Sequence, residues 1–440
     1  MFSVFLSHLC IGQYSGLSKP LPEYHIKISG FDERVLVMSS LRKPKRIMIR
    51  GNNEKEFPYL VKSGEDLRMD QRIENLFLIM NSVMDADPGC RQRKLSLKTY
   101  QVISMTPRVG LIEWMRNTQP LKEFLLNTLS DEEQKYLDPK SIHAPVVQHM
   151  KWVEKVADKD NKRGFQGMFD KVYIKYSYTE TVKEFRLKEG KIPWNLSRRA
   201  LQRLSSSPEA FYVLRSTLLR SHSVVCICQY LLGIGDRHLS NFMVNLKTGH
   251  MVGIDFGHAF GSATQFLPVP ELMPFRLTRQ LTNLNMPLQV KGQMESCMRH
   301  VLRALRADSD LLLSTMDVFV KEPSLDWMNF AEKQMQAGKE TDDAAQDEKW
   351  YPKQKIQFAQ RKLQGDHPCH IMKDELELGH SKREAFRSMV RVLLGDKKEN
   401  IRAELPAQGL SVEQQVAALI DHATDPNILG RTWGGWEPWV

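Results

Sequence analysis

Three polar side chains within six residues, and a fourth a short distance on, are the part of this chain best suited to chemistry. Asp236, His238 and Asn241 lie in Gly-Ile-Gly-Asp-Arg-His-Leu-Ser-Asn, and Asp255 follows two short apolar runs. The turn signal Lys247-Thr248-Gly249 separates those runs, so the stretch is predicted to form a β-hairpin. A hairpin would return Asn241 to the side of Asp255, where an amide and a carboxylate could hold Mg²⁺ against phosphate oxygens.

This arrangement suits phosphoryl transfer, in which a protein mainly positions groups and neutralises charge. Asp236 would then be free to accept the proton of a hydroxyl. The spacing from Asp236 to Asn241 is that of protein-kinase catalytic loops, and Asp255-Phe256-Gly257 has the DFG form. The alternative is a surface hairpin with scattered polar residues. It is disfavoured because three motif elements occur in the right order and spacing.

Lys62 is the candidate phosphate contact in the N-terminal part of the chain. It ends an expected strand, and a helix is predicted over residues 66–85 with one apolar face formed by Ile73, Phe77, Met80 and Met84. Asp70 shares that face, so its carboxylate could pair with Lys62 as the strand lysine and helix glutamate do in kinases. Glu65 and Glu74 are rival partners for Lys62.

The region around Lys62 is predicted to be an antiparallel sheet, with strands near residues 24–28, 35–38, 47–49 and 59–62. Residues 39–46 occupy the place of a kinase phosphate loop but lack Gly-x-Gly-x-x-Gly, so the Ser39 and Ser40 hydroxyls and basic side chains would compensate. A further strand at 100–105 and an apolar link at 110–115 lead to a helix near 120–129. Trp114 and Met115 would face adenine from that link, although an isolated Trp is more often a core residue.

The C-terminal two thirds of the chain is expected to be mainly helical. A helix begins at Ser207-Pro208 and is stopped by Gly233 and Gly235. Further helices are expected at 144–157, 284–320 and 350–400, whereas the rest of 130–190 is polar without a clear pattern and 338–349 is expected to be a mobile loop. Ser411 could cap a helix over 412–423. Three Trp residues within 433–439 predict a tail docked on the larger lobe.

The composition of the segment after Asp255 indicates which class of substrate the chain would bind. Residues 258–275 contain no Lys or Arg. A kinase that phosphorylates anionic lipid head-groups would be expected to place cations there. The apolar, Pro-rich character of this segment favours an extended peptide instead.

Length and composition are those of an ordinary globular protein. The chain has 440 residues, 42% of them hydrophobic and 26% charged, which suits two or three domains. A net charge of +10 favours anionic partners such as ATP, nucleic acid or an acidic protein. Six cysteines without metal-ligand spacing indicate reduced thiols. No apolar run is long enough to span a membrane, and the first ten residues make a poor signal peptide.

Taken together, these motifs resemble the phosphatidylinositol-3-kinase-related protein kinases. The resemblance covers about residues 12–440 and is weakest over 130–200. It implies an α+β bilobal fold, with a small β-rich N-lobe at 23–115, a helical C-lobe at 116–407 and a FATC tail at 408–440; residues 1–22 would be a truncated or alternative start. Met69 and Ser240 depart from the usual pattern, but neither supplies a proposed catalytic group.

The resemblance also implies roles for the residues above, with ATP and Mg²⁺ as cofactors. Asp236 would be the catalytic base and His238 would stabilise the transferring phosphoryl group. Asn241 and Asp255 would hold Mg²⁺, and Lys62, braced by Asp70, would contact phosphate. The remaining nucleotide contacts would be Ser40 at the phosphates and, around adenine, Leu60, Tyr100, Trp114, Met115, Met243 and Ile254.

The implied activity is phosphorylation of Ser or Thr followed by Gln on protein substrates in the nucleus. Residues 260–279 match one family member more closely than the family at large. That member acts in double-strand-break repair by non-homologous end joining and in V(D)J recombination. It meets DNA ends and the Ku heterodimer, and those contacts would run through upstream regions not present here; no membrane partner is expected. Two alternatives remain: a truncated, non-catalytic nucleotide- or partner-binding fragment, and a lipid kinase.

Overall fold

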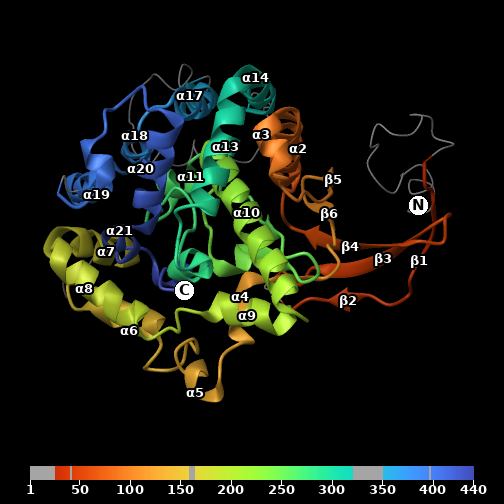
Figure 1. Ribbon diagram of the computed structural model, residues 1–440, viewed down its shortest axis with the longest axis horizontal. Coiled ribbons are helices and arrows are strands. Elements are labelled where there is room, and N and C mark those ends of the chain that lie inside the picture. Colours follow the sequence, from red (N-terminus) through yellow and green to blue (C-terminus); the bar gives the residue numbers. More distant parts are fainter. Residues whose placement is uncertain (1–24, 40–41, 158–163, 321–349, 396–397) are drawn as a thin grey trace. The chain divides into compact units, whose positions relative to one another are not determined.

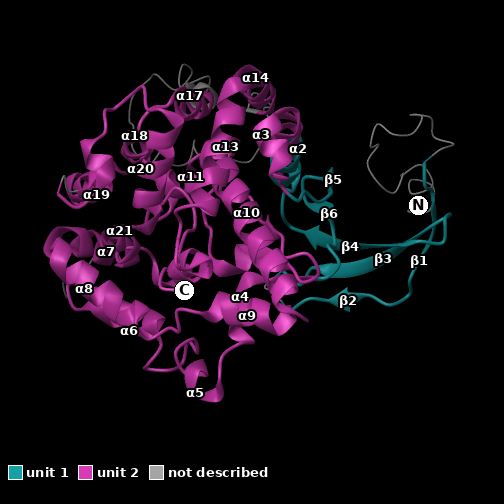
Figure 2. Cartoon of the chain, viewed as in Figure 1, with its two compact units in different colours: residues 1–78, 98–117, 323–332 teal, residues 79–97, 118–322, 333–440 magenta. Residues whose placement is uncertain are grey.

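The computed structural model describes residues 25–39, 42–157, 164–320, 350–395 and 398–440 (Figure 1). Two compact units can be distinguished (Figure 2). Within the described part, the first comprises residues 25–78 and 98–117, and the second comprises 79–97 and the remainder from Thr118 onward. The expected start at 1–22, the Ser40 contact and the loop at 338–349 lie outside the described residues.

The first unit is built on an antiparallel sheet, as predicted. Its strand order is β1-β3-β4-β6-β5, with β2 added on β3. The strands are β1 (Ile28–Phe31), β2 (Leu36–Val37), β3 (Lys45–Gly51), β4 (Glu56–Ser63), β5 (Val102–Thr106) and β6 (Val109–Glu113). The predicted link at 110–115 is wrong for its first four residues, which belong to β6. This strand pairs with β4 on one side and β5 on the other, and a central strand reads as a continuous apolar run.

One face of this sheet carries the core of the unit. Ile49, Tyr59 and Leu111 are buried together, and the partly buried Phe57 and Val61 pack against them. Successive side chains of a strand point to opposite faces. Leu60 and Lys62 therefore project from the other face of β4. The helix α2 (Arg68–Ala86) follows, and its predicted apolar face is confirmed, because Ile73, Phe77, Met80 and Met84 are all buried.

The second unit is mainly helical and contains a small antiparallel sheet, β7-β8-β9. Its strands are β7 (Thr118–Pro120), β8 (Phe242–Asn245) and β9 (Met251–Gly253). Its helices are α3 (Pro88–Gln92), α4 (Leu121–Leu126), α5 (Asp131–Gln134), α6 (Pro145–Glu154), α7 (Gly164–Lys175), α8 (Tyr178–Glu189), α9 (Leu196–Leu204), α10 (Pro208–Leu232), α11 (Ser262–Phe266), α12 (Arg279–Thr282), α13 (Gln293–Ala307), α14 (Ser309–Val320), α17 (Trp350–Gln364), α18 (Pro368–His380), α19 (Phe386–Leu394), α20 (Val412–Thr424) and α21 (Pro426–Leu429). The prediction missed α5, α7 and α8, which lie in the polar region at 130–190 without a clear pattern, and α9, which follows that region.

Helix α10 carries the chain to the candidate catalytic residues and packs beside α13 (Figure 1). The Ser207 side chain accepts a hydrogen bond from the Ala210 amide at 3.2 Å, so the predicted N-cap is confirmed. Gly233 ends the helix at φ +57°, and a Cβ there would lie 2.6 Å from the Gly261 nitrogen. Only glycine satisfies both the left-handed conformation and this close approach.

The C-terminal segment is docked, as predicted from its tryptophans. Ser411 begins α20 with a capping box. Helix α20 packs on α13 and α18, and α21 packs on α8. Trp436 and Trp439 are buried, whereas Trp433 keeps 44% of its surface exposed. The docked tail is thus part of the core of the second unit.

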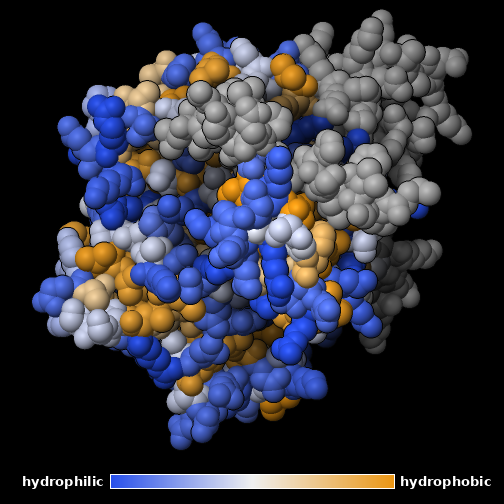
Figure 3. Space-filling view, turned by 90° about the vertical axis from the view of Figure 1, so that its right-hand side faces the viewer, coloured by the Kyte–Doolittle hydropathy of each residue, from blue (hydrophilic) through white to orange (hydrophobic). Residues whose placement is uncertain are grey.

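The described surface is of ordinary character. On the face drawn in Figure 3, hydrophilic residues surround several separate hydrophobic groups. Among the described helices, none combines the length and the apolar character needed to cross a membrane. The five described cysteines, at 90, 226, 228, 297 and 369, are free and buried.

Docking of the tail predicts acid sensitivity through His149. Its Nε2 lies 2.9 Å from the Thr432 carbonyl oxygen, and burial, with Lys188 nearby, lowers its pKa to about 3. In the unfolded chain this imidazole binds a proton near pH 6.5, whereas in the folded chain it does so only near pH 3. The contribution of the neutral imidazole to the free energy of unfolding is therefore fully present above pH 6.5 and is lost as the pH falls toward 3. This one group should remove about 1.4 kcal/mol of the free energy of unfolding per pH unit in that window.

The check is the melting temperature at pH 7, 6 and 5. His149→Gln keeps a donor for the Thr432 carbonyl and should show a shallower loss toward pH 5 than the unaltered chain. His143→Gln, at an exposed position on the segment before α6, is the matched control and should keep the original slope. Equal slopes in all three proteins would contradict the assignment.

Candidate active site

The β8–β9 hairpin forms as predicted and returns Asn241 to the side of Asp255. Phe242 pairs with Gly253 and Val244 pairs with Met251. At the open end, the Ile254 amide donates to the Asn241 carbonyl oxygen at 3.1 Å. Asn241 and Asp255 therefore begin and end the hairpin at the same edge.

A buried guanidinium fixes this edge. Arg237 donates to the carbonyl oxygens of Ile254 at 2.9 Å, of Gly235 at 2.8 Å, of Asn241 at 3.5 Å and of Asp255. Sequence reasoning missed Arg237, although its place between Asp236 and His238 was a signal. One side chain thus links the segment before the hairpin to the segment after it.

The Asn241 side chain is oriented by a hydrogen bond to the backbone of the candidate base. Its Nδ2 donates to the Asp236 carbonyl oxygen at 2.8 Å, which leaves Oδ1 as the remaining acceptor of the side chain. Asp255 is exposed, with φ at +60°. Amide and carboxylate oxygens are ligands that Mg²⁺ accepts, with phosphates and water completing the shell. Among the described residues there is no group of three or more His, Cys, Asp or Glu that could hold a metal ion.

Two imidazoles lie within electrostatic reach of both carboxylates. Burial lowers the pKa of His238, while Asp236 and Asp255 oppose that shift. Burial also lowers the pKa of His258, and the same two carboxylates oppose it. His238 Nδ1 accepts from the Ser240 amide at 3.3 Å, so in the neutral ring Nε2 carries the hydrogen and can donate. His258 was not among the predicted site residues.

Glu271 holds the backbone of the candidate base. Its carboxylate accepts hydrogen bonds from the amides of Asp236 and Arg237, the second at 3.3 Å, and from the Trp436 indole. Asp236 itself adopts φ +57°, a left-handed conformation uncommon outside glycine. Burial raises the pKa of Glu271. No local pattern indicates these contacts, because Asp236, Glu271 and Trp436 are far apart along the chain.

An apolar pocket of about 220 Å³ lies beside Asp236 within the second unit. Its walls come from the segment after Asp255 and from the C-terminal tail. The lining residues are Phe165, Asp236, Leu267, Pro268, Val269, Pro270, Glu271, Thr432, Trp433 and Trp436. Asp236 and Glu271 are the two acidic residues of this lining, and most of the other lining residues are apolar.

In the first unit, the Lys62 ammonium pairs with Glu65, one of the two rivals of the predicted partner Asp70, at 3.2 Å, and Arg42 also contacts Glu65 at 3.3 Å. The bracing of Lys62 by Asp70 stays a prediction. Glu65 lies in the turn directly after β4, so it meets Lys62 without any long-range packing. Glu74, the other rival, accepts from the Tyr100 amide at 3.1 Å, and burial raises its pKa to about 9.

The predicted adenine contacts fall in both units. In the first, Leu60 lies on β4, Tyr100 is buried before β5, and Trp114 and Met115 follow β6 half-buried, with the Arg46 guanidinium 5.4 Å from the Trp114 ring centroid. In the second, Met243 and Ile254 are half-buried at the hairpin. Their common role around a nucleotide stays a prediction, as does the approach of Lys62 to Asp255.

Comparison with known proteins assigns most of the chain. Residues 56–329 match the family model described as phosphatidylinositol 3- and 4-kinase, and residues 409–440 match the FATC domain. The chain is 55% identical over 431 residues to a DNA-dependent protein kinase catalytic subunit of Xenopus laevis, covering 98% of this chain and 10% of that protein. A protein of the same name from Dictyostelium discoideum is 44% identical over 431 residues, with 97% and 10% covered.

More distant relatives share the same region. The serine/threonine-protein kinase TOR of Arabidopsis thaliana is 29% identical over 309 residues, covering 69% of this chain and 11% of that protein. The chain thus spans about a tenth of the length of the curated relatives it matches. A solved structure titled the FAT and kinase domain of CtTel1 matches with a TM-score of 0.66 at 23% identity, covering 98% of this chain and 25% of that one, which supports the fold.

Gly235 provides a test of the packing beneath Asp236. A Cβ at this position would lie 2.2 Å from the Ala263 Cβ and 2.6 Å from Glu271 Oε2. Gly235→Ala should therefore lower the free energy of unfolding by about 1–3 kcal/mol and speed hydrogen exchange at the Asp236 and Arg237 amides. Gly30→Ala is the control, because nothing lies within 4 Å of its added Cβ. Unchanged exchange in Gly235→Ala would show that Glu271 does not hold these amides.

Proposed function

The chain belongs to the phosphatidylinositol 3- and 4-kinase family, and from that premise we propose that it is an ATP- and Mg²⁺-dependent serine/threonine protein kinase. The observation that carries the proposal is the hairpin edge at which Arg237 and the Ile254 amide hold Asn241 beside Asp255, with Asp236 bonded to the same asparagine. These are the groups that phosphoryl transfer requires from the protein.

The proposed roles are those implied by the family resemblance, and the geometry of the hairpin edge supports them. Asp236 accepts the proton of the acceptor hydroxyl as its oxygen forms a bond to the γ-phosphorus, while the bond from that phosphorus to the β–γ bridging oxygen breaks and ADP leaves. His238 donates Nε2–H to the phosphoryl oxygens, and Asn241 Oδ1 and the Asp255 carboxylate would hold Mg²⁺. When bound, ATP supplies the phosphoryl group and Mg²⁺ neutralises its charge. Lys62 stays the proposed phosphate contact of the first unit, where its ammonium lies 3.2 Å from Glu65.

The segment after Asp255 favours a protein over a lipid substrate. Its first basic residue, Arg276, is fully buried and donates to main-chain carbonyls of Arg237, Trp436, Glu437 and Val440. Arg279 donates to the carbonyls of Glu189 and Ile192. Both guanidinium groups therefore already donate hydrogen bonds to main-chain carbonyl oxygens. On the described segment from His258 to Arg279, the Lys and Arg residues are the buried Arg276 and the half-buried Arg279, and an anionic lipid head-group would have to compete with carbonyl oxygens for them.

The pocket beside Asp236 supports preference for Gln directly after the acceptor residue. Its Pro and Trp walls suit the methylene groups of a side chain, and the Glu271 carboxylate can accept from a side-chain amide. A glutamine offers both parts. A glutamate of the same length would place a like charge against Glu271.

The biological setting that we propose is the nucleus. By likeness to the DNA-dependent protein kinase catalytic subunits, the kinase would act in double-strand-break repair by non-homologous end joining and in V(D)J recombination. DNA ends and the Ku heterodimer would be met through regions beyond this chain. Protein substrates are the partners assigned to the described residues.

The central test is phosphate transfer from ATP to a peptide containing Ser-Gln. A bound metal stabilises transition-state charge by several kcal/mol, so Asp255→Ala should lower turnover by on the order of 100-fold or more. Asp308→Ala, exposed after α13, is the matched control and should keep full activity.

Three other results would redirect the assignment. Equal incorporation by Asp255→Ala and the unaltered chain would rule out the proposed metal site. Nucleotide binding by a monodisperse preparation without any transfer would favour the non-catalytic fragment. Transfer to phosphoinositide vesicles but not to peptide would favour the lipid kinase.

A series of peptides that differ in the residue directly after the acceptor tests whether the pocket selects Gln. Replacing the Gln after the acceptor by Glu should lower kcat/KM by on the order of 100-fold, because like charges placed together cost several kcal/mol. Replacement by Ala should cost about tenfold through the lost hydrogen bond. The same Gln→Glu change several residues before the acceptor serves as the control for peptide charge. Equal rates for Gln and Glu would remove Glu271 from substrate selection.

A further inference from the structure

We propose that two side chains of the C-terminal tail, Trp436 and His422, are positioning residues that hold the catalytic loop through the dipeptide Glu271-Leu272. The inference rests on the proposed kinase function for its kinetic consequences. Its structural part concerns hydrogen bonds that exist whether or not the chain transfers phosphate. All the residues involved lie in the second unit.

Trp436 reaches the candidate base through one carboxylate. Its indole Nε1–H donates to Glu271 Oε1, and the Glu271 oxygens accept from the amides of Asp236 and Arg237. Trp436 is 2% exposed, and the Arg276 guanidinium lies 4.2 Å from its ring centroid. The same guanidinium donates to the Trp436 carbonyl at 2.7 Å and to the Arg237 carbonyl at 3.2 Å. The indole can therefore move little without moving Glu271.

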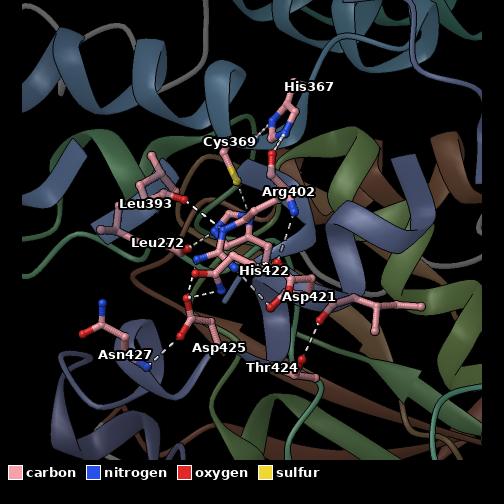
Figure 4. Close-up of polar contacts among 12 residues, drawn as sticks. Leu272, His367, Cys369, Leu393, Arg402, Asp421, His422, Thr424, Asp425 and Asn427 are labelled. Carbon is pink, nitrogen blue, oxygen red and sulfur yellow. Dashed lines mark hydrogen bonds and ion pairs between the residues drawn. The ribbon is translucent and has the colours of Figure 1, made fainter. Parts of the chain in front are cut away.

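His422 holds the next residue of the dipeptide. Its Nε2 lies 2.6 Å from the Leu272 carbonyl oxygen, and its Nδ1 lies 3.4 Å from Cys369 Sγ (Figure 4). Burial keeps the ring neutral by lowering its pKa, with Arg402 adding to that shift. Only the tautomer with hydrogen on Nε2 can donate to Leu272, and the Cys369 thiol can then donate to Nδ1.

The surroundings of His422 are rigid. Arg402 pairs with Asp421 at 2.9 Å and also with Asp425, so charged groups brace the end of α20 on both sides of His422 (Figure 4). Asp425 in turn accepts from the Asn427 amide at 2.8 Å, at the start of α21. The imidazole is thus presented to Leu272 from a fixed helix.

Asp236 needs such support. Its φ of +57° is costly for a residue with a Cβ, and conformations of this kind persist only where surrounding bonds over-determine them. Glu271 supplies the bond to the Asp236 amide, and the tail supplies two bonds to Glu271-Leu272. Loss of the tail's donors should let this amide and its side chain relax from the geometry that transfer requires.

Trp436→Phe is the informative variant, because it keeps an aromatic ring for Arg276 and removes the N–H donor, while the loss of ring volume is matched by the control. Trp439→Phe is the matched control. Trp439 is equally buried in the tail, but its ring packs on His149 at 5.6 Å, away from Glu271. The readouts are kcat and KM for ATP and peptide, together with hydrogen exchange at the Asp236 and Arg237 amides of the 440-residue chain.

In Trp436→Phe we expect about tenfold faster exchange at these two amides and a kcat lowered by about 10- to 100-fold, with the KM for ATP unchanged. Trp439→Phe should leave both quantities as they were. His422→Phe should resemble Trp436→Phe, and His422→Gln, which retains a donor, should restore much of the loss.

Three outcomes would overturn the proposal. They are unchanged exchange in Trp436→Phe, equal effects of the two Trp variants on these amides, and no difference between His422→Phe and His422→Gln. Hydrogen exchange needs no turnover. An inactive chain with the expected exchange pattern would therefore reject the proposed function and keep the positioning contacts.

Discussion

The candidate active site depends on two buried charged side chains that bind backbone. Arg237 collects the carbonyl oxygens of residues 235, 254 and 255, and Glu271 collects the amides of residues 236 and 237. A buried charge is tolerated only when its hydrogen-bonding capacity is used. Here Arg237 and Glu271 form hydrogen bonds with main-chain carbonyl and amide groups that would otherwise lack partners in a loop. The loop therefore has a fixed shape without belonging to a helix or a sheet.

The same device joins the tail to the rest of the second unit. Arg276, Arg402 and Arg431 are all buried, and each donates to main-chain carbonyls. Arg276 reaches the last residues of the chain, and Arg431 reaches the Val172 carbonyl at 2.5 Å. Burial lowers the pKa of Arg276 to about 9. A guanidinium has five donors in a fixed fork, which suits several carbonyls at once. The tail is accordingly a structural part of the site and not an appendage to it.

The segment after Asp255 explains why we favour a protein over a lipid as the substrate. The Arg276 and Arg279 side chains of the segment after Asp255 donate to carbonyl oxygens, and Leu, Pro and Val side chains of the same segment line the pocket. Such a surface offers little to a phosphorylated head-group. It offers packing and one carboxylate to a peptide side chain.

Several features could be predicted from the sequence because they are local. The hairpin that joins Asn241 to Asp255 follows from two apolar runs and a turn. The caps at Ser207 and Ser411 and the apolar face of α2 follow from spacing over a few residues. The family likeness added roles to these positions, since the motif elements stand in the same order.

Other features were missed for different reasons. Spacing left the partner of Lys62 open because three acidic residues lay within reach, and in the structure the path of the turn after β4 brings Glu65 to it. Strand β6 looked like a link because a strand paired on both sides has no alternation to reveal it. The sequence by itself determined the hairpin, the helix caps and the candidate metal ligands. Only the tertiary structure decided that Trp436 and Arg237 secure the loop of Asp236, because these hydrogen bonds join segments that no short-range pattern brings together.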